Sequence, residues 1–595
     1  MIVFGDGKSI PNRKIEEIST ELSWEGAAEK EIESGAFSGS VLYDKRLPYS
    51  EDDFIYDDPE NGIIVLMDGV VYNHEEISRL INGSPGPLRH PQLVSQAFLK
   101  WGPEFVSRLN GDFAICIYQK KNNRVYFFRD HLGIRPLAVS ESDSAFYFAS
   151  DGRALGKVLY RDEKVDHDYL YNQFLFAAYD YTKLPHKHVN LLKFGHWLQV
   201  DSQGSELIRY WEPEKIKKDD TLDQDRVLDD LDLLVRDAVK IRSDKRFTAG
   251  AHVSGGIDSG IVAALARKEY SEQETFFGYP WTPLHAPRKI IEKIEFDERK
   301  LIESLCSLNN ITPCYTDYSV EDYLVNCRRF YTGLIMEKNI QETAKANRTN
   351  LIFSGWGGDD FISMGHRGID ADLIREFDWA YFFKKYSLLR PKQFLSALLF
   401  GAIFPTARRQ YVKYKFEPEI YPYIKDGGGS NLIPQKERDP HHSRRKVHLF
   451  LIEKGHISRR TMDWHLYGKT NGIEYRYPLL DKRIVEYMLK VPSRCLVGGE
   501  HYRIILRKIG KELLPENVLK NKSKSDPVND SFRTYCTKQL IQQIINEFNE
   551  IRKIPDLDFI DFDLLEKDLH KKTVQESDIL FSLQRAQTII KKYNS

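Results

Sequence analysis

The stretch that decides the fold is Val253-Ser254-Gly255-Gly256-Ile257-Asp258-Ser259, in which a short apolar strand passes into a helix. Gly255 and Gly256 allow backbone angles and a close approach that a Cβ atom would block. Such a turn directs successive backbone N–H groups to one point, with the positive end of the helix dipole behind them. Ser254 and Ser259 add hydroxyl donors. The stretch therefore predicts a site that binds the phosphates of a nucleotide.

Asp258 is a carboxylate within this anion-binding loop, so we expect a cation to share the site. A hard Mg²⁺ ion that bridges Asp258 and phosphate oxygens satisfies both charges. The sequence has no GxxxxGK[ST] pattern, so the loop differs from the phosphate loop of kinases and GTPases. The simpler alternative is a Gly-Gly turn capped by Asp258 and Ser259, which any strand-to-helix connection can use.

A second apolar strand empties into a glycine-rich turn at Leu351-Ile352-Phe353-Ser354-Gly355-Trp356-Gly357-Gly358-Asp359-Asp360. In parallel α/β sheets the ligand lies at the carboxyl ends of the strands. We therefore expect Asp258 and Asp359 to bind the same metal ion, with Ser354 and Gly355 beside the nucleotide. Asp360 has an equally simple interpretation as the N-cap of the next helix.

Outward from these loops, the pattern of apolar runs changes between residues 212 and 225. Before it, short apolar runs between turn residues, such as a strand at 63–67 that ends in a turn at Asp68-Gly69, predict an α+β layered sandwich. After a polar linker, alternating strands and helices predict an α/β parallel-sheet domain with a helical extension. Strands are expected at 249–253, 275–278 and 351–353, helices at 227–235, 260–269 and 298–308, and a polar loop at 425–446.

Composition excludes several classes of partner. The 595 residues include 86 Lys+Arg and 87 Asp+Glu, so the near-zero net charge gives no reason to expect nucleic acid or a membrane surface. The longest apolar stretch, 394–404, is far below the roughly 20 residues of a membrane-spanning helix. The first residues lack the pattern of a signal peptide. Six scattered cysteines without a CxxC pair fit a reduced, cytoplasmic protein.

Several ordered motifs resemble the asparagine synthetase superfamily, whose synthetase domain has an SGGxDS pyrophosphate loop and a downstream SGxGxDE turn. Residues 472–481 resemble its G-x-E-x-R-x-P-F-L-D segment, in which we expect Glu474 and Arg476 to form a structural pair. Residues 503–507, 514–518 and 520–522 resemble its K-x-x-L-R, L-P and R-x-K elements. In the first half, residues 68–73, 109–114 and 129–137 resemble the class II glutaminase domain of the family.

The resemblance implies ATP-dependent activation of a carboxylate as an acyl-adenylate, followed by attack of an amine to form an amide. Residues 254–259 would hold the leaving pyrophosphate, and Mg²⁺ on Asp258 and Asp359 would spread its charge. Lys522, by its match to R-x-K, would be the mobile cation on the same phosphates. From the sequence alone, Lys522 can equally belong to a solvated lysine face.

The first half departs from the family wherever glutamine hydrolysis needs a particular residue. A working glutaminase exposes an N-terminal cysteine whose thiolate attacks the amide, whereas Met1 is followed by Ile2 and Cys116 lies within an apolar strand. The oxyanion-stabilising Asn, a substrate-binding Glu and the acid that binds the glutamine amine are matched by Asp68, Val70 and the region of His90. We therefore predict an inactive glutaminase-like domain at 1–212 and an amide-forming domain at 225–595.

The amine must then be free ammonia or an amine of the substrate itself. Trp356 replaces the Glu that asparagine synthetases link to the ammonia step, so we expect a remodelled acceptor pocket with Trp356 and Asp463. Members with such changes resemble β-lactam synthetases and lasso-peptide macrolactam cyclases, which close an intramolecular amide. Aromatic and cationic residues between 366 and 445 favour a folded peptide as substrate. Asp463, His465 and Tyr467 are candidates for the general base.

The sequence thus predicts an ATP- and Mg²⁺-dependent amide ligase that forms AMP and pyrophosphate, and favours a lasso-peptide macrolactam cyclase. Its substrate would be a peptide or a small-molecule acid, and a precursor-processing protease is a candidate partner. The alternatives are an ammonia-dependent asparagine synthetase-like enzyme and a β-lactam synthetase-like small-ring ligase. A rival of a different class is a nucleotide-binding scaffold without chemistry.

Overall fold

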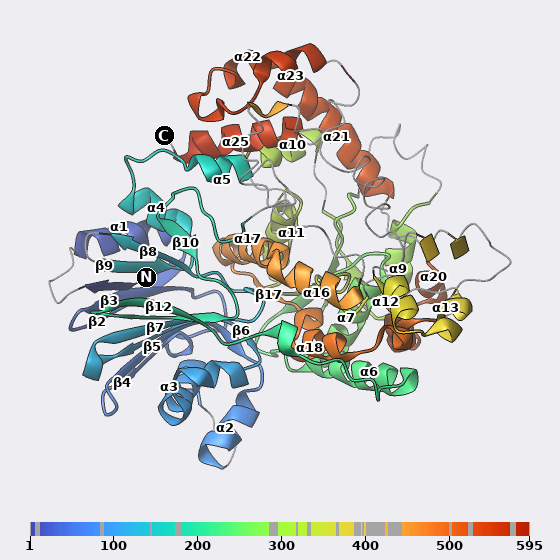
Figure 1. Cartoon of the computed structure of the whole chain (residues 1–595), viewed down its shortest axis with the longest axis horizontal. Helices are drawn as coiled ribbons and strands as arrows, with labels where there is room; N and C mark the ends of the chain where they lie inside the picture. The colour runs from blue at the N-terminus through green and yellow to red at the C-terminus, as the bar shows by residue number, and fades with distance from the viewer. Residues whose placement is uncertain are drawn as a thin grey trace.

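The structure is a computed structural model. It describes residues 2–5, 12–83, 88–142, 145–172, 180–284, 296–316, 319–329, 335–363, 368–385, 394–395, 398–399, 423–425, 443–498, 503–521, 527–569, 571 and 579–593. Figure 1 shows a strand-rich first half beside a second half with many helices, and a group of C-terminal helices above both. Lys522 and most of the predicted segments 366–445 and 425–446 lie outside the described residues.

Two six-stranded antiparallel sheets form the first half. In spatial order, one consists of β10 (Val189–Leu191), β8 (Ala138–Ser142), β9 (Ala145–Ala149), β1 (Ile2–Gly5), β3 (Phe37–Asp44) and β2 (Ala27–Ser34). The other consists of β12 (Gly204–Arg209), β11 (His196–Asp201), β7 (Arg124–Arg129), β6 (Gly111–Gln119), β5 (Ile63–Val71) and β4 (Ile55–Asp58). Their facing sides share one apolar core.

Helices cover the outer faces of both sheets. Helix α3 (His90–Trp101) covers the outer face of the second sheet, and α1 (Asn12–Leu22) and α4 (Gly152–Leu159) cover the outer face of the first. The predicted layered sandwich is confirmed.

The predicted turn at Asp68-Gly69 is wrong, because β5 continues to Val71. Gly69 pairs with Phe113 of β6 and has a φ of +143°. A Cβ atom at Gly69 would lie 2.0 Å from the carbonyl oxygen of Asp112. This glycine therefore serves the close approach of two strands and does not reverse the chain.

The second half contains a five-stranded parallel sheet, as predicted. Its order is β15 (Thr312–Pro313), β14 (Phe277–Tyr279), β13 (Ala249–His252), β16 (Leu351–Phe353) and β17 (Glu474–Arg476). One face is covered by α6 (Gln224–Lys240), α7 (Ile257–Glu269), α9 (Arg299–Leu308) and α19 (Ile504–Gly510). The other is covered by α11 (Glu337–Ala346) and α17 (His456–Asn471). Helix α17 also faces the first half (Figure 1), so it connects the two.

The C-terminal helices have a core of their own. It is formed by α21 (Pro527–Asn546), α22 (Phe548–Ile551), α23 (Phe562–Asp568) and α25 (Ile579–Tyr593), together with α5 (His167–Asn172) and α10 (Val320–Arg329). Among the described helices, none has both the length and the hydropathy to cross a membrane, and this includes the 20-residue α21.

The predicted linker runs along the second half. Trp211, just before it, is buried and donates from Nε1 to Glu486 of α18 (Lys482–Lys490) at 2.9 Å. Asp219 donates its backbone N–H to the carbonyl of Lys490, also at 2.9 Å. These contacts fix the path of the connection.

Candidate active site

The two predicted loops lie side by side, because β13 and β16 pair in parallel and each loop follows its strand. Their contact is close: a Cβ atom on Gly355 would lie 2.7 Å from the backbone nitrogen of Ser259. One on Gly358 would lie 2.3 Å from Oδ1 of Asp258. Gly355 therefore has no room for a side chain against this backbone, and a side chain at Gly358 would displace the Asp258 carboxylate, so the two glycines let the loops share one site.

One guanidinium joins the carboxylates of the two loops. Arg503 donates from Nη1 to Oδ2 of Asp258 at 3.0 Å and from Nη2 to Oδ1 of Asp359 at 2.7 Å. Two carboxylates thus converge on one cation, as the sequence led us to expect for a metal ion. This donor set fits Mg²⁺, which proteins commonly bind through one or two carboxylates plus substrate phosphates.

Arg503 is a site residue that the sequence does not predict. It immediately precedes α19 and has a φ of +63°, a left-handed conformation that is costly for a side chain with a Cβ atom. The residue that pairs with both loop carboxylates is thus also one with a strained backbone. The only signal in the sequence was its place at the start of the 503–507 element.

The first loop binds part of its own polar groups. Gly255 donates its N–H to Oε1 of Glu298 at 2.7 Å. The sequence predicted that this amide would point to the phosphates, and the structure shows it bonded within the protein instead. The hydroxyls of Ser254 and Ser259 lie 2.7 Å apart and hydrogen-bond to each other. Helix α7 begins at Ile257, and the amides of its first turn have no acceptor within the helix. Anion binding therefore falls to these amides and the two hydroxyls.

Lys522 itself lies outside the described residues. The residue before it, Asn521, donates from Nδ2 to the carbonyl of Gly255 at 3.3 Å. Arg507 of α19 donates to the carbonyl of Asn521 at 3.1 Å. The chain that leads to Lys522 thus contacts the first loop.

Three indoles surround the start of the second loop, and we call Trp281, Trp356 and Trp464 the tryptophan cluster. Trp464 lies between the other two, with ring centroids 5.9 Å from Trp281 and 6.3 Å from Trp356. The Arg460 guanidinium lies over the Trp356 ring at 3.8 Å. Asp463, the expected companion of Trp356, instead lines a cavity on the side of α17 that faces the first half. Neighbouring helical residues point about 100° apart, which separates Asp463 from the cluster.

A buried carboxylate lies beneath this cluster and was not predicted. Glu337 accepts from His252 Nε2 at 2.9 Å, from Trp281 Nε1 at 2.8 Å and from the Tyr475 hydroxyl at 2.5 Å. Burial favours its neutral form, but His252 and the hydrogen bonds outweigh burial and lower the pKa of Glu337. His252 Nδ1 lies 3.1 Å from Oγ of Ser354, so the network reaches the second loop.

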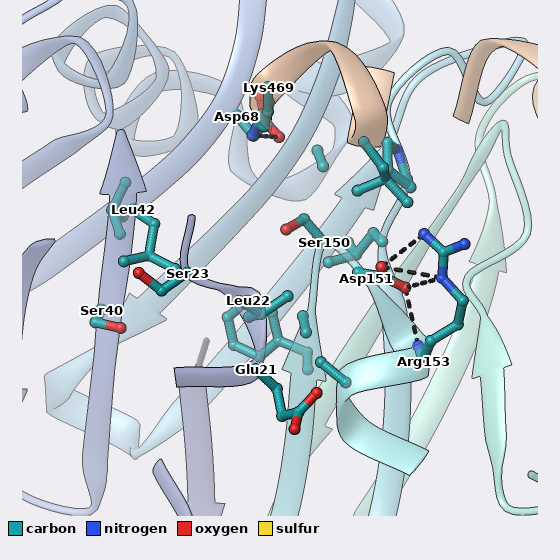
Figure 2. A pocket seen from close by; sticks show the side chains of 18 of the residues that line it. Glu21, Leu22, Ser23, Ser40, Leu42, Asp68, Ser150, Asp151, Arg153 and Lys469 are labelled. Atoms are coloured by element: carbon teal, nitrogen blue, oxygen red, sulfur yellow. Dashed lines mark hydrogen bonds and ion pairs between the residues drawn. The ribbon is translucent and has the colours of Figure 1, made fainter. Parts of the chain in front are cut away.

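Between the two sheets of the first half and α17 lies a cavity of about 440 Å³ (Figure 2). Apolar side chains, including Leu42, Leu66 and Phe148, form much of its wall. Figure 2 shows the ion pair of Asp68 and Lys469 at one end and that of Asp151 and Arg153 at another.

Asp68, at the position matched to the oxyanion-stabilising Asn, hydrogen-bonds to side chains of the second half. It accepts from Lys469 Nζ at 2.6 Å and from His465 Nε2 at 3.0 Å. Burial would raise the pKa of Asp68, but the charges of Lys469 and nearby groups hold it well below its usual value. An ionised carboxylate accepts hydrogen bonds and repels an oxyanion, so Asp68 cannot replace an amide donor.

Further polar contacts join the two halves around Asp68. Arg135 pairs with Glu474 at 2.5 Å. Glu474 also pairs with Arg476 at 3.0 Å, which is the structural pair that the sequence predicted. Burial opposes ionisation, but Arg135 and Arg476 lower the pKa of Glu474 to about 2. Asn110 and Asp481 extend the contact with a hydrogen bond of 3.1 Å. The interface is therefore built from buried charges that satisfy one another.

Cys116 is buried in β6, as expected of a core residue. Burial raises the pKa of its thiol well above the ordinary value. A thiol kept in its neutral form is a poor nucleophile. Cys116 is therefore unsuited to replace the missing N-terminal cysteine.

Comparison with known proteins finds matches for both halves of the chain. A family model described as glutamine amidotransferase domain matches residues 55–211, and one described as asparagine synthase matches residues 230–588. Asparagine synthetase [glutamine-hydrolyzing] 3 of Bacillus subtilis is 21% identical over 493 residues, which cover 78% of this chain and 75% of the relative. A putative asparagine synthetase of Methanocaldococcus jannaschii is 27% identical over 233 residues, covering 38% of this chain and 45% of the relative.

Among solved structures, glutamine phosphoribosylpyrophosphate amidotransferase from B. subtilis matches with 12% identity. The match covers 60% of this chain and 80% of that chain, but the TM-score is only 0.26.

Asparagine synthetase homologues are ATP-dependent carbon–nitrogen ligases that form AMP and pyrophosphate, so the prediction of such a ligase is confirmed at the level of the family. Because the second family model covers more than half of the 595 residues, the chain belongs to the asparagine synthase family.

Proposed function

We propose that this chain adenylates a carboxylate with MgATP and closes an intramolecular amide, and that it is a lasso-peptide macrolactam cyclase. The observation that carries the proposal is the convergence of Asp258 and Asp359 on one cation, in a molecule whose Asp68 is bound in an ion pair. The first feature supports phosphate chemistry. The second supports the loss of glutamine hydrolysis as a source of ammonia.

In the proposed reaction, an oxygen of the substrate carboxylate attacks the α-phosphorus of ATP, and the bond to pyrophosphate breaks. The hydroxyls of Ser254 and Ser259 and the first amides of α7 would bind the departing pyrophosphate. Asp258 and Asp359 would hold Mg²⁺, which supplies neutralisation of the phosphate charge. The substrate's own amine then attacks the acyl carbon, loses its proton and displaces AMP.

The surroundings of Trp356 favour an amine delivered by the substrate over free ammonia. Arg460 already covers one face of the Trp356 ring. Free ammonium gains no binding energy beside a guanidinium, because like charges repel, whereas the amine of a bound substrate is held at the site by the rest of the substrate. A tethered amine reacts at a much higher effective concentration than a free one.

The test is to incubate the protein and MgATP with peptides that carry a free N-terminal amine and one side-chain carboxylate. We expect AMP, pyrophosphate and a product that is lighter by one water. N-acetylated versions of the same peptides should be adenylated but not cyclised. Release of ADP would contradict the proposal, and formation of asparagine from aspartate and ammonium would favour the synthetase alternative.

A further inference from the structure

Arg460 is a partly exposed cation without a polar partner among the described residues. Its guanidinium stacks on Trp356 at 3.8 Å and lies 5.9 Å from the ring of Trp464, and no hydrogen bond or ion pair to another described side chain accompanies the stacking. Burial lowers the pKa of Arg460. Stacking on an indole stabilises a guanidinium but leaves its in-plane N–H groups available.

Two carboxylates act on Arg460 through charge, and neither forms an ion pair with it among the described contacts. Glu337 acts on it through charge, but its oxygens already accept from His252, Trp281 and Tyr475. Asp360 also acts on it through charge. Arg533 of α21 adds a second positive charge that disfavours the charged form of Arg460.

The position of this guanidinium relates it to the reaction. Trp356 directly follows Gly355, and Gly355 packs against the backbone of Ser259 where the two loops meet. Trp356 and Arg460 are partly exposed, whereas Trp464 is buried beneath them. An anion on Arg460 would therefore lie on the side of the second loop that carries the tryptophan cluster. The phosphate-side cation, Arg503, is on another element and is already paired with both loop carboxylates.

We propose that Arg460 and the tryptophan cluster form a subsite for a carboxylate of the acid substrate other than the one that is activated. Guanidinium is planar and presents paired N–H donors that match a carboxylate. The indole rings hold the guanidinium in place, so little freedom is lost when the anion binds. This assignment rests on the proposed function, because it takes the anion to belong to the substrate of the ligase.

The subsite predicts a preference among acids. A substrate with a second carboxylate near the reacting one pairs with Arg460. An analogue in which that second carboxylate is replaced by an amide leaves the guanidinium without an anion. The α-phosphate of the nucleotide is the other source of an anion at this position. If the anion is a substrate carboxylate, a dicarboxylate should bind and inorganic phosphate should not. If the anion is the α-phosphate, inorganic phosphate should bind as well.

The test uses glutarate as the probe and follows tryptophan fluorescence, since two indoles contact Arg460. We expect saturable quenching or enhancement by glutarate and none by glutaramide or inorganic phosphate. Arg460→Met should weaken glutarate binding by about 10- to 100-fold, as expected for loss of a charge-assisted hydrogen-bonded pair. Arg460→Lys should lose less, and Arg459→Met, next to it on α17, should bind glutarate as the wild type does.

Three results would overturn the assignment: no response of the wild type to glutarate, an equal response of the Arg460→Met variant, or a response to phosphate as strong as that to glutarate. MgATP binding, measured separately by calorimetry, should be the same in the wild type and in Arg460→Met. Failure of the wild type to bind MgATP would instead contradict the proposed function. The two failures are thus distinguishable.

Discussion

The edge where the two glycine-rich loops meet and the contact around Asp68 both bring carboxylates and cations together across distant segments, but they differ in exposure. At the loop edge Asp258 and Arg503 are only 14% and 11% exposed, but the side chain of Asp359 is 56% exposed. At the contact between the halves, the side chains of Arg135 and Glu474 are only 4% and 5% exposed. An exposed carboxylate can exchange one cation for another, whereas a buried pair is costly to break. The first arrangement suits a site that binds and releases ions, and the second suits a fixed interface.

The largest effect is expected at the loop edge. Asp258→Asn and Asp359→Asn should each reduce substrate-dependent AMP formation by about 100- to 1000-fold, the range found for loss of one group that stabilises developing charge. The fold should persist, which circular dichroism would verify. Asp229→Asn is the matched control, because Asp229 is exposed and, in the described part of the chain, pairs with Lys508 at the surface. Full activity of both loop variants would mean that neither carboxylate takes part in the reaction.

The second effect tests the fixed interface. Asp68→Asn, which introduces the residue usual in the family, should lower the free energy of unfolding by about 1–3 kcal/mol, because Lys469 keeps its charge but loses its partner. A double-mutant cycle with Lys469→Met, followed by urea unfolding, measures the coupling. We expect no glutamine hydrolysis in the variant. Appearance of that activity would show that only Asp68 had blocked the site.

A third, smaller effect concerns pH. Burial, reinforced by Arg135, lowers the pKa of His465 to about 4, so the folded protein holds this histidine neutral with Nε2–H on Asp68. The unfolded chain, with a pKa near 6.5, binds the proton more readily, so stability should fall as the pH drops from about 6.5 towards 4. Stability from Glu474 is lost only further down, between its ordinary pKa and about 2.

The contribution of His465 is isolated by comparing the wild type with His465→Gln. Other histidines with lowered pKa values, among them His90, His131, His186 and His448, add to the same trend in both proteins. We expect a shallower decline in the urea midpoint of the variant between pH 7 and pH 5. Equal slopes would mean that His465 titrates alike in the folded and unfolded chain.

The smallest effect is expected for Cys116→Ala. Ligase activity should be unchanged, and the free energy of unfolding should fall by only about 1 kcal/mol, as for a small core truncation. Thiol alkylation of the native wild type should likewise leave activity intact. Rapid loss of activity on alkylation, absent in the variant, would give this buried thiol a role that its surroundings argue against.

Strands and loops that follow from local patterns could be predicted from the sequence. The strand at 351–353 was located to the residue, and both glycine-rich turns lie at the expected edge of a parallel sheet. Gly69 was misread because a glycine after Asp signals a turn, whereas here only the partner strand explains it.

Features that depend on distant segments could not be predicted. Arg503 meets Asp258 across 245 positions and Asp68 meets Lys469 across 401. Glu337 and Arg460 belong to helices whose sequence does not reveal that both contact the tryptophan cluster, Glu337 through Trp281 and Arg460 through Trp356 and Trp464. Asp463 was grouped with Trp356 by proximity to the family motif, but its face of α17 is turned to the cavity.

The central claim is that the two loops form one adenylating site, and the exchange of labelled pyrophosphate into ATP tests it most directly. With a peptide acid present, we predict exchange by the wild type and by Asp229→Asn, and loss of exchange in Asp258→Asn and in Asp359→Asn. Exchange that survives in either loop variant, or acid-dependent exchange of labelled phosphate with release of ADP, would contradict the account.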